Sequence, residues 1–386
     1  MLFLKQIRQV HGMKYARSAH LFIACSLALL LGACATVNED YNPAKKHHRP
    51  EGFQNNYTDA TDKSQAEFLR WQWERLKSGL PKPPLQLTPV VVPDLKFVSA
   101  NIGKAQEPAI TWIGHATMLV QMGGLNVITD PVFSERASPV QFAGPKRYQA
   151  PGIALSDLPR IDIVLLSHNH YDHLDVASVK ALNAQAGGPP LFIVPLGVKK
   201  WFAGEGITNV KQMDWWDKQT VKLPNGQVEV HFTPVQHWSA RSLGDRRATL
   251  WGGYALFAPD FHAYFSGDTG YSQDFIDTQK HFAARQTPAL GGGFDMALIA
   301  VGAYEPRWFM KEQHVNPEEA VQIHLDLQAK RSIGVHWGTF DLTDESLDQP
   351  PKDLAVARAA KKLPQEAFDV MAIGQTLKLP RRKVAP

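Results

Sequence analysis

The feature that most constrains this chain is a cluster of metal-binding residue types placed directly after an apolar segment. Residues 161–166 have the apolar character of a buried strand, and His168, His170, Asp172 and His173 follow at once. Side chains two positions apart in extended backbone point to the same side, and a turn after them brings Asp172 and His173 round to face the first two histidines. The pattern predicts a metal site at the end of a strand.

Three further residues of the same kinds occupy equivalent positions. Each follows an apolar segment that is expected to be a strand: His237 after residues 228–235, Asp268 after residues 263–267 and His336 after residues 332–335. Strand ends can converge on one edge of a sandwich, so we expect these side chains to join the first cluster there.

The combined set of seven ligands exceeds the three or four that one catalytic zinc requires, and suits two ions that share a carboxylate. The natural division gives one ion His168, His170 and His237 and the other Asp172, His173 and His336, with Asp268 bridging. Nitrogen and carboxylate ligands without thiolate are compatible with zinc, iron or manganese, and a histidine-rich set favours zinc. We therefore expect two divalent metal ions, with zinc as the leading candidate.

Short apolar segments alternate with turns from residue 110 onward. The expected strands are residues 110–120, 127–129, 161–166, 192–194, 228–233, 249–257, 263–265, 294–301 and 332–335. Helical patterns cover residues 176–184, 275–284, 317–329 and 354–362, and Asn225-Gly226 between two short strands predicts a hairpin. This order is neither a regular β-α repeat nor all-β, and it predicts an α/β fold, a four-layer αββα sandwich of two mixed sheets with helices outside.

The start of the chain has the character of a targeting segment. Lys5, Arg8, Lys14 and Arg17 occur without an acidic residue in the first 33 positions, and residues 21–31 form an apolar run. That run is too short for a bilayer span of about 20 residues but suits a signal-peptide core. These four cations account for the whole formal charge of +4, so the remaining chain is close to neutral and its charge does not indicate nucleic-acid binding.

The apolar run ends in Leu31-Gly32-Ala33-Cys34, which resembles the lipobox of bacterial lipoproteins. That resemblance implies removal of residues 1–33 as a signal peptide, lipidation of Cys34, and anchoring in the bacterial cell envelope. The absence of aspartate at Ala35 favours the outer membrane, facing the periplasm. The alternative is an ordinary secretory signal with an incidental cysteine. Since Cys25 is the one other cysteine, the mature chain beyond Cys34 has neither a disulfide nor a thiolate ligand.

Residues 34–106 are polar and rich in proline, which predicts a tether and an N-terminal docking arm ahead of a main domain at residues 107–386. The pair His47-His48 within the arm is interpreted as part of a solvated tail.

A short helix is expected within the arm, at residues 65–77. Leu69, Trp73 and Leu76 recur there at helical spacing and predict an apolar face. We expect that face to pack on the main domain, and the alternative is a surface that contacts lipid.

The order of the candidate ligands resembles the pattern of the metallo-β-lactamase superfamily. That pattern is His-x-His-x-Asp-His, then a later His, an Asp after Ser-Gly and a final His. More narrowly, the chain is similar to the N-acylphosphatidylethanolamine-hydrolysing phospholipase D family. The similar segments are residues 113–117, 129–131, 138–147, 214–216, 236–238, 267–271, 302–320 and 336–340. The resemblance runs from about residue 110 to the C-terminus. It implies the αββα fold and hydrolysis of such lipids to N-acylethanolamine and phosphatidic acid by a hydroxide that two metal ions activate.

The resemblance also implies roles for individual residues. Asp172 and Asp268 would serve catalysis as well as metal binding, and His314 would donate a proton to the leaving group. A second interpretation makes His314 a structural residue at the entry to the helix at residue 317. The candidate substrate-binding residues are Gln141, Phe142, Tyr171, Tyr304 and Trp308. Phe142 stands where the family has tyrosine, so acyl-chain preference does not carry over.

Two residues near the ligands are interpreted as supports: His115 as a hydrogen-bonding neighbour of the ligands and Asp130 as a residue that fixes adjacent loops. Two other functions stay open. One is a hydrolase of the same fold acting on a soluble ester, lactone or sugar phosphate, and the other is a non-catalytic envelope lipoprotein. The expected partners are a phospholipid substrate and the membrane that holds the lipid anchor.

Overall fold

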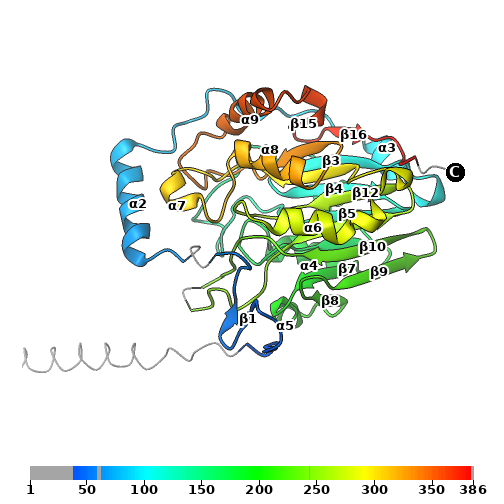
Figure 1. Ribbon diagram of the computed structural model, residues 1–386, viewed down its shortest axis with the longest axis horizontal. Coiled ribbons are helices and arrows are strands. Elements are labelled where there is room, and N and C mark those ends of the chain that lie inside the picture. The colour runs from blue at the N-terminus through cyan, green and yellow to red at the C-terminus, as the bar shows by residue number, and fades with distance from the viewer. Residues whose placement is uncertain (1–37, 59–61, 243, 384–386) are drawn as a thin grey trace, which may run out of the picture. The chain divides into compact units, whose positions relative to one another are not determined.

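Strands with apolar residues on both faces stack into two sheets in this protein (Figure 1). The structure is a computed structural model that describes residues 38–58, 62–242 and 244–383. Both large sheets have seven strands, in the order β16-β3-β4-β5-β6-β7-β8 and β15-β14-β13-β12-β11-β10-β9. Each sheet is mixed, since β5 to β8 and β12 to β15 pair in parallel and the other neighbours pair antiparallel.

The strands of the first sheet are β3 (Ala109–Gly114), β4 (Thr117–Met122), β5 (Leu125–Thr129), β6 (Ile163–Leu165), β7 (Leu191–Pro195), β8 (Val210–Met213) and β16 (Thr376–Lys378). Those of the second sheet are β9 (Lys218–Leu223), β10 (Gly226–Thr233), β11 (Gly253–Ala258), β12 (Phe261–Phe265), β13 (Met296–Ala300), β14 (Ser332–Val335) and β15 (Phe368–Asp369). A separate two-stranded ribbon joins β1 (His48–Arg49) and β2 (Gly52–Phe53).

The α-helices are α2 (Gln65–Ser78), α3 (Leu95–Ala100), α4 (Val176–Asn183), α5 (Val198–Gly204), α6 (Asp274–Phe282), α7 (Arg307–Met310), α8 (Pro317–Asp326) and α9 (Gln349–Ala360). Six of them lie in connections between parallel strands: α4 and α5 in the first sheet, and α6, α7, α8 and α9 in the second.

Strand alternation explains the four layers. In β6, Ile163 and Leu165 enter the core between the sheets, whereas Val164 faces outward into a second core. That outer core includes Val179 of α4 and Phe202 of α5, and the helices α6, α8 and α9 contribute to the core of the second sheet. Because both faces are buried in strands such as β4, β5 and β13, these strands appear in sequence as continuous apolar runs.

The predicted fold is confirmed: the protein is an αββα sandwich of two mixed sheets. The hairpin at Asn225-Gly226 forms between β9 and β10, where Leu223 pairs with Gly226. The helix expected at residues 354–362 begins earlier, as α9 at Gln349, and includes two prolines in its first turn. Proline fits there because the first turn of a helix leaves its N–H groups without intrahelical partners.

The arm helix is present as α2, but the expected packing face is wrong. Leu69, Trp73 and Leu76 are 65%, 66% and 76% exposed, whereas Trp71 is buried. Trp71 stacks on Phe309 of α7 at 5.0 Å between ring centroids, so α2 stands beside α7 (Figure 1). One large aromatic contact fixes the orientation of α2 and leaves the leucine and tryptophan face toward solvent.

The interpretation of His47-His48 as a solvated tail is also wrong. His48 is buried, and its Nε2 lies 2.9 Å from a carboxylate oxygen of Asp214, which follows β8. The ribbon of β1 and β2 is thereby held against the main domain, where Phe53 enters the core between the sheets.

The predicted signal peptide and the lipidation residue Cys34 lie outside the described residues. Within the described parts of the chain, no helix has both the length and the apolar character needed to cross a membrane.

Candidate metal centre

The metal-capable side chains gather at one edge of the sandwich. They come from the ends of four strands: His168, His170, Asp172 and His173 after β6, His237 after β10, Asp268 after β12 and His336 after β14. Because β10 and β12 both pair antiparallel with β11, they run in the same direction and end at the same edge. All seven predicted ligands belong to groups in which the potential ligand atoms lie within 4.8 Å of one another.

The first group consists of three histidines. Nε2 of His168 lies 2.8 Å from Nδ1 of His170, and Nε2 of His237 completes the group. Nε2 of His237 is buried and has no hydrogen-bond partner within the described ranges of the chain. Imidazole nitrogens that point their lone pairs into one small space are arranged as ligands of a cation.

The second group is built around Asp172. Its Oδ2 lies 3.2 Å from Nε2 of His336 and 3.4 Å from Nε2 of His173. The same oxygen lies 3.1 Å from Nε2 of His115, which approaches from the turn between β3 and β4. His115 therefore contacts a predicted ligand and belongs to the second group by position.

Asp268 lies between the two groups. Its Oδ2 is 3.1 Å from Nε2 of both His173 and His336. The same oxygen is 3.9 Å from Nε2 of His168 and of His237. One carboxylate oxygen thus faces both sets of imidazoles, which is the position of a bridging ligand.

For three of the ligand histidines, a buried partner fixes which ring nitrogen faces the centre. The Nδ1 of His173 lies 2.6 Å from Asp130, and the Nδ1 of His237 lies 2.9 Å from the carbonyl of Gln313. Nδ1 of His168 lies 2.9 Å from Oγ of Ser167, whose hydroxyl donates to Asp130. In the neutral ring that binds metal, a proton held at Nδ1 leaves the lone pair of Nε2 facing the centre, as metal ligation requires.

Local backbone strain accompanies this arrangement. Asp130, His115 and His336 have φ values of 34°, 54° and 62°, in the left-handed region that non-glycine residues rarely occupy. Gly267, with φ 57°, precedes Asp268, and a Cβ there would lie 2.6 Å from the side chain of Ser167. These strained positions are held by surrounding packing and cluster where the side chains converge.

Electrostatics divide the histidines into two kinds. Burial disfavours a charged His336, but the Asp268 carboxylate and hydrogen bonds to Asp172 and Asp268 outweigh it and raise the pKa of His336 to about 9. Burial lowers the pKa of His170 to about 4. Burial alone would raise the pKa of Asp268, yet His173 and His336 hold it well below the usual value. Burial alone would also raise the pKa of Asp172, but His173 and hydrogen bonds hold it well below its usual value. The carboxylates of Asp172 and Asp268 therefore stay ionised in a buried site and require positive charge beside them.

The residues present fit bound metal ions. The donor set consists of imidazole nitrogens and carboxylate oxygens, which zinc accepts. Nε2 of His237 in the first group and Oδ1 of the Asp268 carboxylate are buried and lack a hydrogen-bond partner among the described residues. Buried polar atoms are rarely left without a partner, so these atoms point to a ligand.

His314 lies at the rim of this centre. It comes from the turn between α7 and α8, and its Nδ1 lies 3.9 Å from Oδ2 of Asp268. The atom has no hydrogen-bond partner in the part of the chain that the structure describes, and burial lowers the pKa of the ring to about 4. The N-cap of α8 is Asn316 rather than His314, and both interpretations of His314, as proton donor and as structural residue, stay predictions.

The five candidate substrate-binding residues lie in different surroundings. Tyr171 is half-buried beside the ligands, and its hydroxyl donates to the carbonyl of Arg241. Phe142 is 85% exposed, and the neighbouring Gln141 bonds the backbone of Arg136. Tyr304 and Trp308 do not join the ligand groups.

Tyr304 is buried, and its hydroxyl donates to Asp353 of α9. Trp308 is partly exposed, and the guanidinium of Arg70 in α2 lies 4.5 Å from its ring centroid. Their roles in substrate binding stay predictions.

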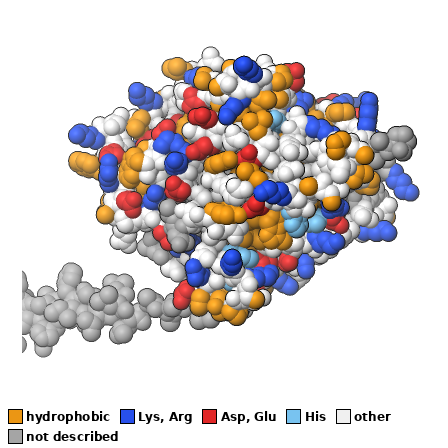
Figure 2. All heavy atoms as spheres, viewed as in Figure 1, with side chains coloured by type: hydrophobic (Ala, Val, Ile, Leu, Met, Phe, Trp, Pro, Cys, Tyr) orange, Lys and Arg blue, Asp and Glu red, His pale blue; other side chains and the backbone are white. Residues whose placement is uncertain are grey.

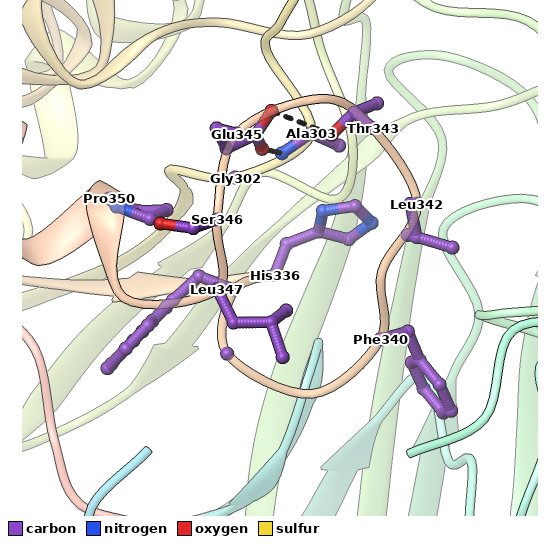
Figure 3. A pocket seen from close by; sticks show the side chains of 12 residues that line it. Gly302, Ala303, His336, Phe340, Leu342, Thr343, Glu345, Ser346, Leu347 and Pro350 are labelled. Atoms are coloured by element: carbon purple, nitrogen blue, oxygen red, sulfur yellow. Dashed lines mark hydrogen bonds between the residues drawn. The ribbon is translucent and has the colours of Figure 1, made fainter. Parts of the chain in front are cut away.

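A loop closes the back of the centre behind His336. Figure 3 shows the His336 ring enclosed by the residues that line a cavity of about 20 Å³, with Glu345 bonded to the backbone of Ala303. Glu345 also accepts from the N–H groups of Tyr304 and Glu305, and so fixes the segment after β13. A Cβ at Gly302 would lie 2.1 Å from the carbonyl of His336, so only glycine permits this close approach.

The fold and the site together define a metal-dependent hydrolase of the metallo-β-lactamase fold. The chain belongs to the metallo-β-lactamase superfamily, because residues 125–337 match the model of the beta-lactamase superfamily domain. Among solved structures, an isothiocyanate hydrolase from Delia radicum gut bacteria superposes with a TM-score of 0.53 at 18% identity, covering 70% of this chain and 99% of that one. At that identity the likeness supports the fold alone.

Two sequence relatives carry a more specific name. The N-acyl-phosphatidylethanolamine-hydrolyzing phospholipase D 1 of Caenorhabditis elegans is 39% identical over 275 residues, 69% of this chain and 74% of the relative. The mitochondrial N-acyl-phosphatidylethanolamine-hydrolyzing phospholipase D of Saccharomyces cerevisiae is 37% identical over 262 residues, 67% of this chain and 53% of the relative.

One contributor to the centre has no sequence signal that points to it. Asn55, in the N-terminal arm, donates from its side chain to the carbonyl of His237 at 3.0 Å and accepts from the N–H of His237 at 2.9 Å. A single asparagine in a polar segment resembles any other, so only the folded arrangement identifies it.

Proposed function

We propose that this protein is a phosphodiesterase that hydrolyses N-acylphosphatidylethanolamine-type phospholipids to N-acylethanolamine and phosphatidic acid, with two divalent ions, most favourably zinc. The observation that carries the proposal is the meeting of two buried ligand groups at Oδ2 of Asp268. The 39% and 37% identities to two proteins named for this reaction support the substrate class.

One ion would be held by His168, His170 and His237. The other would be held by Asp172, His173 and His336, and Asp268 would be shared by both. Bound divalent ions would supply a water-derived nucleophile at neutral pH and offset the negative charge of the phosphodiester. The side chain of Asp172 is 15% exposed, so its carboxylate can reach and orient the attacking water. Hydrolysis forms a bond from the water oxygen to phosphorus and breaks the bond to the N-acylethanolamine oxygen.

The departing oxygen must receive a proton, and His314 is the residue placed to provide it. Its unpartnered Nδ1 lies at the rim of the ligand groups. Burial keeps the ring neutral at pH 7 without substrate, because its pKa is about 4. A phosphodiester brought against the ring adds negative charge, which raises that pKa and favours the protonated, donating form.

The decisive assay uses the purified protein with N-acylphosphatidylethanolamine, with unacylated phosphatidylethanolamine, and with soluble esters, lactones and sugar phosphates. The proposal expects N-acylethanolamine and phosphatidic acid in equal amounts, and loss of both in Asp268→Asn. Turnover of a soluble substrate alone would replace the lipid with another substrate of the same fold. Full metal content without any turnover would favour a non-catalytic lipoprotein.

We further propose that Cys34 carries a lipid that holds the enzyme on the outer membrane, facing the periplasm, where its substrate lies. The lipobox-like sequence at residues 31–34 supports this placement. The exposed face of α2 with Leu69, Trp73 and Leu76 would add contact with the lipid surface. Membrane fractionation of Cys34→Ser tests the anchor: release into the soluble periplasmic fraction is expected, and unchanged membrane association would refute it.

A further inference from the structure

A second set of buried ligand residues lies outside the metal centre. His47 and His48, at the start of the ribbon β1–β2, meet Asp214 at the end of β8. Their side chains are 11%, 2% and 5% exposed, and their ligand atoms lie within 4.8 Å of one another. None of the three belongs to the groups at the edge of the sandwich.

Both imidazoles point the same nitrogen at one carboxylate. Nε2 of His47 lies 2.7 Å from Oδ1 of Asp214, and Nε2 of His48 lies 2.9 Å from Oδ2. The rings are held in place by aromatic neighbours, His47 stacked on Trp215 at 4.4 Å and His48 edge-on to Phe53 at 5.0 Å. The donor atoms are therefore fixed before any ligand binds, which reduces the entropy cost of binding.

The outer nitrogen of His48 can take either protonation state without moving. Its Nδ1 lies 3.1 Å from the carbonyl of Asp40 and also 3.1 Å from the N–H of Asn42. When Nδ1 carries the proton it donates to Asp40, and Nε2 then presents a lone pair toward Asp214. That is the tautomer of a metal-bound histidine, held by a backbone carbonyl as such ligands usually are.

A partly exposed cation already lies at this carboxylate. The ammonium of Lys45 contacts Oδ2 of Asp214, and its side chain is 38% exposed, so it can swing into solvent. Burial alone would raise the pKa of Asp214, but bonds and charge from His47 and Lys45 keep that pKa far below its usual range. The carboxylate is thus ionised and ready to exchange the ammonium for another cation.

We propose that His47, His48 and Asp214 bind a divalent cation of the zinc class, separate from the catalytic ions. Two imidazole nitrogens and one carboxylate oxygen are a common zinc set, with a fourth position open to water. The site fastens the start of the arm to the main domain. Asn55 lies a few residues further along the same segment, and its side chain bonds the carbonyl and the N–H of His237. A cation held by His47, His48 and Asp214 would therefore also support a ligand of the catalytic centre.

Zinc content per chain tests the proposal without reference to hydrolysis. The full-length protein is stripped with chelator, reconstituted with zinc alone, freed of excess metal and analysed by mass spectrometry for bound zinc. The His47→Gln/His48→Gln variant is expected to hold one equivalent fewer than the wild type. The control is His281→Gln, since His281 is exposed and stacks on Trp216 at 4.5 Å, much as His47 stacks on Trp215, but belongs to no ligand group. Equal zinc in the double variant and the wild type overturns the proposal.

A second variant keeps the test decisive if the double variant does not fold. Lys45→Gln removes the competing ammonium and leaves all three ligands in place. If a cation binds here, zinc affinity for the additional equivalent rises about 3- to 10-fold, as measured by competition with a chromophoric chelator. If the group is an ammonium-centred ion pair only, Lys45→Gln shows no additional equivalent and no gain in affinity, and the proposal fails.

Discussion

Asn55 lies 182 residues before His237 in the chain, yet its side-chain amide bonds both the carbonyl and the N–H of that histidine. Nδ1 of His237 is held as well, by the carbonyl of Gln313. Removing a group that orients a metal ligand typically lowers metal affinity by about 10- to 100-fold. At the scale of residues, the centre therefore depends on supports that come from distant parts of the chain.

Substituting Asn55 tests that dependence. In Asn55→Ala both bonds to His237 are lost, and zinc affinity at the catalytic centre is expected to fall about 10- to 100-fold. Competition titration with a chromophoric chelator measures it. The matched control is Asn56→Ala, because the Asn56 amide bonds Asp274 rather than a ligand. Identical zinc affinity in Asn55→Ala and Asn56→Ala would show that the arm does not support the centre.

Substituting His314 tests the proton donor. His314→Ala is expected to lower kcat about 10²- to 10⁴-fold, the usual contribution of general acid catalysis, while zinc content stays at the wild-type level. The pH dependence of kcat should also lose the limb that the donor controls. Unchanged turnover with intact zinc would assign His314 a structural role.

Metal binding should depend on pH through His336 and His173. Burial works against their charged forms, but the carboxylates outweigh it, raising the pKa of His173 well above its usual value and that of His336 to about 9. Both rings are therefore protonated at pH 7 without metal, and a metal must displace those protons. Apparent zinc affinity should rise toward pH 9, by about tenfold per pH unit for each proton displaced. Calorimetry at pH 7 in buffers of different ionisation enthalpy counts the protons, and a count of zero contradicts the assignment.

At the scale of elements, α2 shows how one contact overrides a pattern. Helical spacing of Leu69, Trp73 and Leu76 correctly predicts a helix, because periodicity and the capping box at Ser64 are local properties. The face that packs is set by Trp71, which stacks on Phe309 and donates to Asp344. Figure 2 shows apolar side chains among basic and acidic ones at this side of the molecule. An exposed apolar face with nearby cations suits a lipid surface.

The exposed face of α2 should matter only where there is lipid. Leu69→Ser with Trp73→Ser, made in a Cys34→Ser background, is expected to reduce vesicle binding at least tenfold, since each large apolar side chain contributes about 1.5–3 kcal/mol when buried. Hydrolysis of a short-chain soluble analogue should be unchanged. Val356→Ser on α9, also at an exposed apolar position, is the control. Vesicle binding equal to that of the control would exclude α2 as a lipid contact.

At the scale of the whole molecule, the two sheets are joined at the metal centre as well as through their core. His168 to His173 belong to the first sheet, and His237, Asp268 and His336 to the second. Ions that bind ligands from both sheets bind only the folded protein. Metal binding therefore contributes directly to the stability of the sandwich.

Removing metal should lower the melting temperature by several degrees. A metal site stabilises the fold by about 2.7 kcal/mol when the free metal concentration is 100 times the dissociation constant of that site. Thermal unfolding with excess chelator measures the loss, zinc-saturated chelator is the control, and added zinc should restore the original value. A melting temperature that is insensitive to chelator would mean that no ion links the sheets.

Sequence alone determined the αββα sandwich and the positions of the candidate ligands after apolar strands, because apolar runs, turn chemistry and the spacing of His168 to His173 are properties of short segments. It did not separate β3 from β4, which form one continuous expected strand at residues 110–120, because both are apolar. Tertiary structure alone decided which face of α2 packs, that Asn55 holds His237, and that His47 and His48 meet Asp214. Asn55 and His237 are 182 positions apart in the chain, and His48 and Asp214 are 166 positions apart. The physical reason is that they depend on where whole segments come to rest against one another, and no periodicity within a segment encodes that position.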